Sequence, residues 1–280
     1  MLIDLHVHSS NTQGVSFSLE ELASHAKQVG LDGFCITDEH TTGSIREIKE
    51  VSSSAGILIL VGLEALTDKG HFLVFLPEPE ALEKLTGQLP LTEDGNLPYK
   101  WLQETAARHQ GILVAAHPFD RNVPGSPGDS LVGLAGVSAV EVLNASRPPM
   151  TNELAEEIAA GAGLPGVGGS DGRSTMEQLG RFATLVRGPL SNEAELIERI
   201  RSHDVWPVAI GKPAFPASKP APRGRSDRRD GPRRGRSDSR GSSDRRRSGS
   251  RGSRGGPRGN KDGGRSHRRG RGKPKPPRSD

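Results

Sequence analysis

Branched apolar residues stop at Ile210, and this limits where the chain can form a packed core. After that position the sequence contains no Leu, Ile or Val, and its single aromatic residue is Phe215. A segment of this composition cannot bury enough apolar surface to offset the conformational entropy of ordering it. We therefore divide the 280-residue chain into a folded domain, residues 1–211, and a disordered Arg/Gly/Ser/Pro-rich basic tail, residues 212–280.

The charge is divided at the same place. Residues 1–211 contain 14 Lys and Arg against 28 Asp and Glu, whereas residues 212–280 contain 24 Lys and Arg against 6 Asp. A tail with this excess of cations is expected to bind polyanions through counterion release, with steep salt dependence and no sequence readout. We expect nucleic acid as a partner of residues 212–280. The alternatives are a solubilising tail and a tail held against the acidic domain.

The remaining composition indicates a cytoplasmic protein. Cys35 is the single cysteine, so no intramolecular disulfide can form, which fits a reducing compartment. No apolar run is long enough to span a membrane. The first residues show no basic segment followed by an apolar one, as a secretory signal would. We expect no membrane partner.

Residues 1–211 alternate short apolar runs with amphipathic helical patterns. Strands are predicted at residues 2–8, 33–38, 57–63, 72–76, 112–116, 139–143, 165–168 and 182–186. Helices are predicted from Ser18 to Gly30, at 99–109, at 152–160 and from Asn192 to Ser202, with Ser18–Glu21 as a capping box and Ser191 as the last cap. This alternation predicts an α/β fold whose parallel strands close into a barrel. An open doubly wound sheet is the alternative, but no glycine fingerprint follows the first strand.

Two histidines end the first predicted strand. Because side chains alternate between the faces of a strand, Asp4, His6 and His8 should point one way, and the apolar residues between them the other. Two imidazoles on one face, two residues apart, can share a metal ion. A hydrogen-bonded histidine pair is the alternative reading.

Further acidic and imidazole residues stand where other predicted strands end or begin. They are Asp38 with Glu39 and His40, then Glu64, His71, His117 and Asp171. A barrel builds its active site at the carboxyl ends of its strands. We therefore predict that these residues meet in a metal site.

The order of these motifs resembles the polymerase and histidinol phosphatase (PHP) family of metal-dependent phosphoesterases. The similar stretches are Asp4-Leu5-His6-Val7-His8-Ser9, Ile36-Thr37-Asp38 with His40, Gly62-Leu63-Glu64, His71, Ala116-His117-Pro118, Glu141-Val142-Leu143-Asn144 and Gly169-Ser170-Asp171. Residues 179–207 resemble the extension that often closes such barrels. The resemblance implies a distorted TIM-like (β/α)7 barrel that holds divalent ions.

Carried over to this sequence, the resemblance implies two ions and six ligands. His6, His8, Glu64 and Asp171 would hold one ion, and Glu64, His71 and His117 the other, with Glu64 as the bridge. Mixed imidazole and carboxylate ligands suit Zn, Mn or Fe. Asp38 is either a further ligand or a partner that orients a histidine.

This chain departs from the family pattern at the place of a third ion. Many relatives hold that ion with an Asp after the first histidine pair, the His of a Thr-Asp-His motif and a His two residues past the last Asp. Here Gln13 and Arg173 take the first and last places, Glu39 is an extra residue inside the motif, and His40 remains. We hypothesise that the third ion is absent and that Arg173 binds the phosphate in its stead. A surface arginine is the alternative.

The sequence thus predicts a metal-dependent phosphoesterase. A bridged pair of ions would lower the pKa of a bound water and hold a hydroxide at neutral pH. Arg173 would neutralise charge on the phosphoryl oxygens, and His40 is the predicted general acid. Three functions stay open: hydrolysis of a small phosphomonoester or nucleotide, cleavage of RNA or DNA captured by the tail, and non-catalytic nucleic-acid binding.

Overall fold

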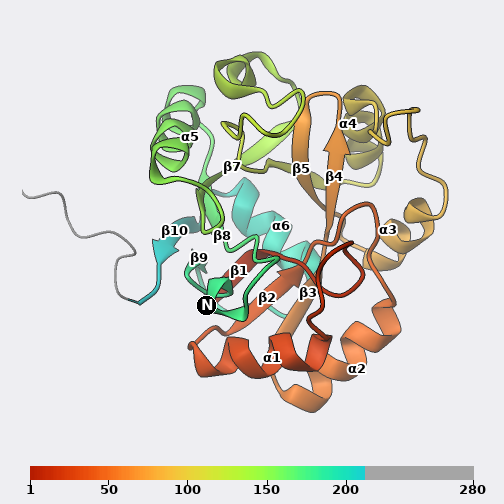
Figure 1. Cartoon of the computed structure of the whole chain (residues 1–280), viewed down its shortest axis with the longest axis vertical. Helices are drawn as coiled ribbons and strands as arrows, with labels where there is room; N and C mark the ends of the chain where they lie inside the picture. Colours follow the sequence, from red (N-terminus) through yellow and green to blue (C-terminus); the bar gives the residue numbers. More distant parts are fainter. Residues whose placement is uncertain (212–280) are drawn as a thin grey trace, which may run out of the picture. The chain divides into compact units, whose positions relative to one another are not determined.

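The computed structural model describes residues 1–211, and the predicted disordered tail, residues 212–280, lies outside the described residues. The described part is an α/β domain with two five-stranded sheets (Figure 1). The first sheet has the order β10-β9-β1-β2-β3 and contains β1 (Leu2–Val7), β2 (Gly33–Ile36), β3 (Leu58–Val61), β9 (Phe182–Val186) and β10 (Val205–Ala209). The second has the order β4-β5-β6-β7-β8 and contains β4 (Leu63–Thr67), β5 (Gly70–Phe75), β6 (Ile112–Ala115), β7 (Val137–Asn144) and β8 (Gly166–Gly169).

Both sheets are mixed, which differs from the predicted parallel barrel. Strands β1, β2 and β3 are parallel, as are β6, β7 and β8. Strand β4 is antiparallel to β5, and β5 to β6, while β9 runs antiparallel to both β1 and β10. The strand predicted at 57–63 is confirmed over Leu58–Val61, which is β3, but its predicted end is wrong. The extended run is interrupted at Gly62, so that β3 and β4 belong to different sheets. An added Cβ at Gly62 would lie 2.6 Å from the Phe75 ring.

Within residues 1–211 the strands form two separate sheets and do not close into one hydrogen-bonded barrel. The strand pairing therefore does not show the predicted (β/α)7 barrel. Where β8 lies beside β1 and β9, side-chain oxygens instead of backbone carbonyls accept hydrogen bonds from backbone N–H groups. The Ser170 N–H donates to Asp4 Oδ1 at 2.9 Å, and the Gly168 N–H donates to Thr184 Oγ1 at 2.9 Å. An isolated parallel bridge between Val7 and Gly172 is the pairing left at this seam in the described residues.

The helices cover the outer faces of the sheets and fill the space between them. Helices α1 (Leu19–Gln28) and α2 (Ile45–Ala55) pack on the first sheet, whereas α3 (Pro79–Thr86), α4 (Tyr99–Arg108) and α5 (Pro149–Ala162) pack on the second. Helix α6 (Glu193–Arg201) contributes Leu196, Ile197 and Ile200 to a core that also contains residues of both sheets. This places α6 between the sheets (Figure 1).

Two predicted details of local structure have different outcomes. The capping box of α1 is confirmed, since Ser18 Oγ accepts from the Glu21 N–H at 3.2 Å and Glu21 Oε2 accepts from the Ser18 N–H at 2.9 Å. Ser191 as the cap of α6 is wrong. Asn192 Oδ1 accepts from the Glu195 N–H at 2.9 Å, and Ser191 instead donates to the Glu195 carboxylate.

The two histidines at the end of β1 lie side by side, with ring centroids 5.0 Å apart. Strict alternation nevertheless fails in this strand, because Val7 packs in a different apolar cluster from Ile3 and Leu5. The cause is a register shift in the β1–β2 pairing between Asp4 and Val7. None of the helices formed by residues 1–211 is long and apolar enough to cross a membrane.

The first testable prediction concerns Glu193, a buried carboxyl at the start of α6 whose Oε1 accepts from the Val61 N–H at 2.9 Å. Burial raises the pKa of Glu193 above its ordinary value of 4.5, and the Val61 N–H opposes this only in part. The charged form is therefore penalised in the folded state. The contribution of Glu193 to stability should fall as pH rises through 4.5 and should level off above the raised pKa. Glu193→Gln keeps an acceptor for Val61 and should remove this fall.

Urea denaturation of both proteins across this pH range is the measurement. The two curves should meet at acidic pH, and the variant should be the more stable protein at neutral pH. A variant that is less stable at neutral pH would contradict the assignment.

Candidate metal centre

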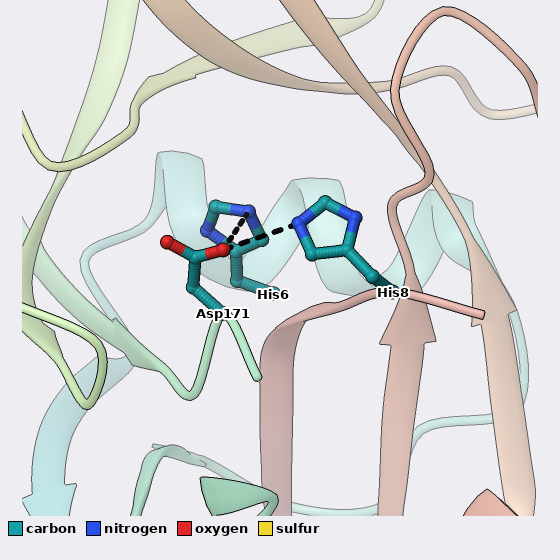
Figure 2. A group of neighbouring side chains, drawn as sticks. All are labelled: His6, His8 and Asp171. Carbon is teal, nitrogen blue, oxygen red and sulfur yellow. Dashed lines mark hydrogen bonds and ion pairs between the residues drawn. The ribbon is translucent and has the colours of Figure 1, made fainter. Parts of the chain in front are cut away.

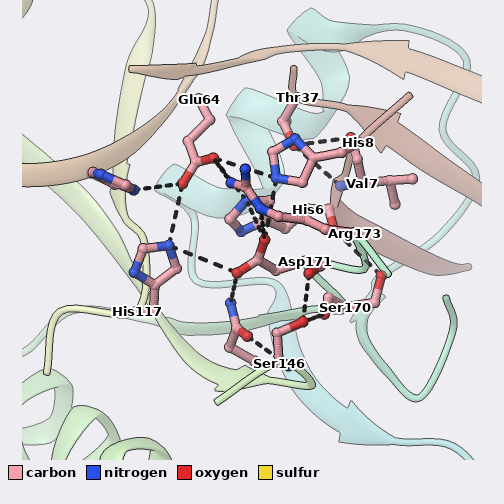
Figure 3. Close-up of polar contacts among 12 residues, drawn as sticks. His6, Val7, His8, Thr37, Glu64, His117, Ser146, Ser170, Asp171 and Arg173 are labelled. Carbon is pink, nitrogen blue, oxygen red and sulfur yellow. Dashed lines mark hydrogen bonds and ion pairs between the residues drawn. The ribbon is translucent and has the colours of Figure 1, made fainter. Parts of the chain in front are cut away.

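Six predicted ligands come together between the two sheets, and Figure 3 labels all of them except His71. Each is placed by the end or the edge of a strand: His6 by the end of β1, His8 just beyond it, Glu64 by β4, His71 by β5, His117 after β6 and Asp171 after β8. All are buried except His71, which is partly exposed. Residues separated by up to 165 positions therefore share one polar centre.

The first group of ligand atoms surrounds one point. The Asp171 Oδ1 atom lies 3.2 Å from His8 Nε2 and 3.7 Å from His6 Nε2, as Figure 2 shows. The Glu64 Oε2 atom lies 3.3 Å from His8 Nε2 and 3.6 Å from His6 Nε2. Two imidazole nitrogens and two carboxylate oxygens thus converge.

The second group uses the other oxygen of Glu64. The Oε1 atom lies 2.9 Å from His71 Nδ1 and 3.2 Å from His117 Nε2. The two oxygens of one carboxylate therefore face two separate histidine pairs. This is the arrangement expected of a bridging ligand.

Outer partners orient the first two histidines. The Glu141 Oε1 atom lies 2.9 Å from His6 Nδ1, and Thr12 Oγ1 lies 3.1 Å from His8 Nδ1. The Thr12 hydroxyl donates its hydrogen to Asp38 Oδ1 at 2.7 Å, so its oxygen can accept a hydrogen bond from His8 Nδ1–H. Protonation of both Nδ1 atoms leaves the Nε2 lone pairs facing the centre, the usual arrangement of metal-binding imidazoles.

Asp38 belongs to this outer layer. Its Oδ1 accepts from the Ser9 N–H and the Thr12 hydroxyl, each at 2.7 Å, and its Oδ2 accepts from the Ser9 hydroxyl at 2.6 Å. Of the two roles predicted for Asp38, the geometry favours the orienting one.

The sequence reasoning missed Glu141 as a site residue. Its second oxygen accepts from the His117 N–H and from Asn144 Nδ2, each at 2.9 Å, so it fixes residues on both sides of the centre. Asn144 also donates to Asp171 Oδ2 at 3.3 Å. The signal was present, because Glu141 is an acidic residue inside an otherwise apolar strand.

Two arginines supply fixed positive charge. Arg173 donates from Nη2 to Glu64 Oε2 at 2.8 Å, from Nε to Asp171 Oδ1 at 3.2 Å, and from Nη1 to the Glu39 carboxylate. Arg147, which sequence reasoning also missed, lies 3.1 Å from Asp171 Oδ2 and 2.8 Å from Asp120 Oδ2. No sequence pattern marks Arg147, because it lies in the connection after β7.

The other residues singled out near the expected third ion lie differently. Gln13 is exposed in a turn. His40 is partly buried, its N–H donates to Glu64 O at 3.0 Å, and neither ring nitrogen has a hydrogen-bond partner among the described residues. Burial lowers the pKa of His40, and the Glu39 and Glu64 carboxylates oppose this.

The backbone is strained around the centre. His40, His117 and Asp171 adopt left-handed backbone conformations, with φ values of 56°, 30° and 47°. Residues other than glycine rarely do so, and such outliers gather at functional sites, where the surrounding structure maintains them.

Charge is concentrated here. Burial raises the pKa of Glu64, but His6 and the hydrogen bonds from the neighbouring imidazoles outweigh it and hold the pKa well below the ordinary value. Burial lowers the pKa of His6, but Glu141, Asp171 and Glu64 outweigh it and hold the pKa well above the ordinary value. Buried carboxylates at this density require cations as partners.

The residues present fit divalent ions. Three groups have ligand atoms within 4.8 Å of one another: His6, His8 and Asp171; His6, His117 and Glu141; and Glu64, His71 and His117. The His6 Nε2 and His117 Nδ1 atoms are buried with no hydrogen-bond partner in the described structure. Imidazole and carboxylate donors of this kind suit Zn, Mn or Fe. An α/β fold with this centre defines the class of protein as a metal-dependent hydrolase.

Comparison with known families agrees with the motifs. Residues 4–122 match the PHP domain, and residues 149–205 match the PHP-associated family. The chain therefore contains a PHP domain followed by a PHP-associated segment, as its motifs predicted. No curated protein sequence matches it.

Two solved structures share the fold. One is a protein from Bifidobacterium adolescentis assigned as a metal-dependent phosphoesterase, with 20% identity and a TM-score of 0.51, covering 72% of this chain and 96% of the other. The second is an amidohydrolase from Chromobacterium violaceum with bound sulfate and no metal, with 16% identity and a TM-score of 0.52, covering 74% of this chain and 97% of the other.

A second prediction follows from Gly169, where β8 passes directly against the centre. A Cβ at this position would lie 2.5 Å from His6 Cβ and 2.9 Å from Glu141 Oε1. Gly169→Ala should therefore displace His6, lower the free energy of unfolding by about 1–3 kcal/mol and weaken divalent-ion binding. Urea denaturation and calorimetric titration with Mn²⁺ are the measurements.

Gly161→Ala is the matched control, because a Cβ at this helical position meets nothing within 4 Å. It should stabilise the protein by roughly 0.5–1 kcal/mol and leave ion binding unchanged. Wild-type ion affinity in Gly169→Ala would contradict the role assigned to this close approach.

Proposed function

We propose that the protein hydrolyses phosphoesters with two divalent ions held by His6, His8, Glu64, His71, His117 and Asp171. The observation that supports this best is Glu64, whose two oxygens face separate histidine pairs at 2.9–3.6 Å. The backbone of Glu64 is also fixed, since the Glu64 N–H donates to Asp38 O at 3.1 Å and the Glu64 C=O accepts from the His40 N–H. A bridging ligand has to be held in this way.

Ions bound in the centre would supply Lewis-acid activation of water and of the phosphoryl oxygen. The chain's own groups do the rest. Glu141 and Thr12 hold the histidine nitrogens in the required tautomer. Arg173 and Arg147 place guanidinium groups beside Asp171, where they can bind phosphoryl oxygens. His40, whose two ring nitrogens have no hydrogen-bond partner within residues 1–211, is the proposed general acid for the leaving oxygen.

We propose further that no third ion is bound. Gln13 is exposed and Arg173 already fills part of the centre with a fixed positive charge that cannot be deprotonated. The proposed substrate is a small phosphomonoester or a nucleotide. Cleavage of RNA or DNA is the second candidate, and the 24 Lys and Arg of residues 212–280 favour it. The convergence of six ligands favours catalysis over binding alone.

The experiment uses the full-length protein. Bound metals are measured by elemental analysis, and hydrolysis is assayed on a chromogenic phosphomonoester, a phosphodiester and labelled single-stranded RNA. Two ions per chain and turnover of the small esters would support the proposal. Turnover confined to RNA would support the nuclease, and an ion-free, inactive protein would refute both.

A matched pair of histidine variants gives the third prediction. His117 and His203 both have left-handed backbones, with φ of 30° and 57°, but His203 is exposed and does not belong to the ligand groups. Asn tolerates this conformation. His117→Asn should lose ion occupancy and at least about 100-fold in kcat/KM, more than outer partners typically contribute. His203→Asn should retain both. Equal behaviour of the two variants would remove His117 from the centre.

The fourth prediction tests His40 as general acid. Protonation matters most for leaving groups of high pKa, so His40→Gln should slow hydrolysis of an alkyl phosphate by about 10²-fold or more and a nitrophenyl phosphate far less. Parallel assays of both esters on ion-loaded protein give the ratio. The same loss with both esters would show that His40 does not protonate the leaving oxygen.

A further inference from the structure

The Arg173 side chain is shared by three carboxylates. It donates to Glu64 Oε2 and Asp171 Oδ1 at 2.8 and 3.2 Å, and its remaining nitrogen, Nη1, donates to Glu39 (Figure 3 shows the first two). These neighbours outweigh the effect of burial, which would lower its pKa, and raise the pKa of Arg173. The guanidinium is thus permanently charged and anchored on three sides.

Two of these three anchors compete with the ions. The Glu64 and Asp171 oxygens bonded to Arg173 are the same atoms that lie 3.3 and 3.2 Å from His8 Nε2. If these oxygens bound divalent ions, their hydrogen bonds to the Arg173 guanidinium would weaken, and the positive charges of the ions and of the guanidinium would repel each other. Glu39, which is outside the ligand groups, is the anchor that remains.

Glu39 is itself held firmly. Its N–H donates to Thr12 Oγ1 at 3.1 Å, the hydroxyl that also contacts His8. Glu39 and Glu64 form an isolated parallel bridge, and the N–H of the following residue donates to Glu64 O. The carboxylate is three-quarters buried. Its backbone therefore moves with the centre, and its side chain can fix Arg173 relative to the ions.

Glu39 and Arg173 are also two of the three sequence departures at the place of the third ion, and they meet although 134 positions separate them. Either charge without the other would be left partly buried and unpaired, which is costly. Together they form an ion pair. The pairing gives one physical reason for both departures.

We propose that Glu39 is a positioning residue, which holds the Arg173 guanidinium beside the ion centre so that its Nε and Nη2 protons face a phosphoryl oxygen of the substrate. This rests on the proposed function, in which Arg173 binds phosphate. The ligand chemistry is a tetrahedral oxyanion, and a planar donor fork held at one end suits it.

The fifth prediction is a double-mutant cycle on full-length, ion-loaded protein, with the affinity for inorganic phosphate measured by calorimetry. Glu39→Gln should weaken phosphate binding at least about tenfold, the size expected for loss of a charge-assisted anchor. In an Arg173→Met background the same change should have no further effect. Glu39→Asp should recover part of the affinity, and bound metal by elemental analysis should match the wild type in every variant.

Glu80→Gln is the matched control, because Glu80 forms an exposed ion pair with Lys49 away from the centre. It should leave phosphate affinity unchanged. A crystal structure of the ion-loaded wild type gives a direct readout, in which Arg173 should stay within hydrogen-bond distance of Glu39.

Each other outcome overturns the positioning role. An equal effect of Glu39→Gln in both backgrounds would mean that Glu39 acts without Arg173, and loss of metal would make it a ligand. Wild-type phosphate affinity in the variant, or no phosphate binding by the wild type, would also refute it. Failure of the proposed function looks different: no phosphoester is turned over, while phosphate affinity still depends on Glu39 through Arg173.

Discussion

The structure depends on how one buried carboxylate is surrounded. Glu64 is fully buried, and its two oxygens contact imidazoles from β1, β5 and the end of β6. An ionised carboxyl in this position is costly unless cationic or metal partners compensate it. The backbone of Glu64 is held as well. Strand β4 begins just after the interruption at Gly62, and Glu64 forms backbone hydrogen bonds with Asp38 and His40. The break that separates the two sheets is therefore also what brings Glu64 to the centre.

The sheets also meet at a second place, where β8 lies beside β1, and this junction likewise both separates the sheets and positions residues of the centre. Where β8 lies beside β1, the Asp171 N–H donates to His6 O at 2.8 Å, and Asp4 takes the Ser170 N–H. Side-chain and irregular bonds replace a regular ladder here, and Asp171 adopts a left-handed backbone. A regular barrel would satisfy these groups with fewer constraints on side chains. The open seams leave polar groups that orient ligands, which links the departure from a closed barrel to the geometry of the centre.

The sequence was most informative where a short apolar run ends in a polar residue. His6, His8, His117 and Asp171 could be placed because strand ends meet at one edge. Helices α2 and α3 were not predicted, although both have local signals. Ser44 caps α2, and the proline that opens α3 is favourable at a first helical position, but three consecutive serines of modest helix propensity weaken the pattern of α2. The sheet break at Gly62 and the salt bridges of Arg147 depend on tertiary contacts, which no periodicity encodes.

The charges around the centre differ in how firmly they are fixed. Imidazoles and divalent ions exchange protons and ligands, so the positive charge they supply depends on pH and on metal supply. A guanidinium neither loses its proton at ordinary pH nor depends on metal supply for its charge. The Arg173 side chain thus gives the centre a permanent cation, which forms ion pairs with the nearest carboxylates, Glu64 and Asp171. A dedicated acceptor outside the ligand set, Glu39, is the physical requirement for keeping that cation available to a substrate anion.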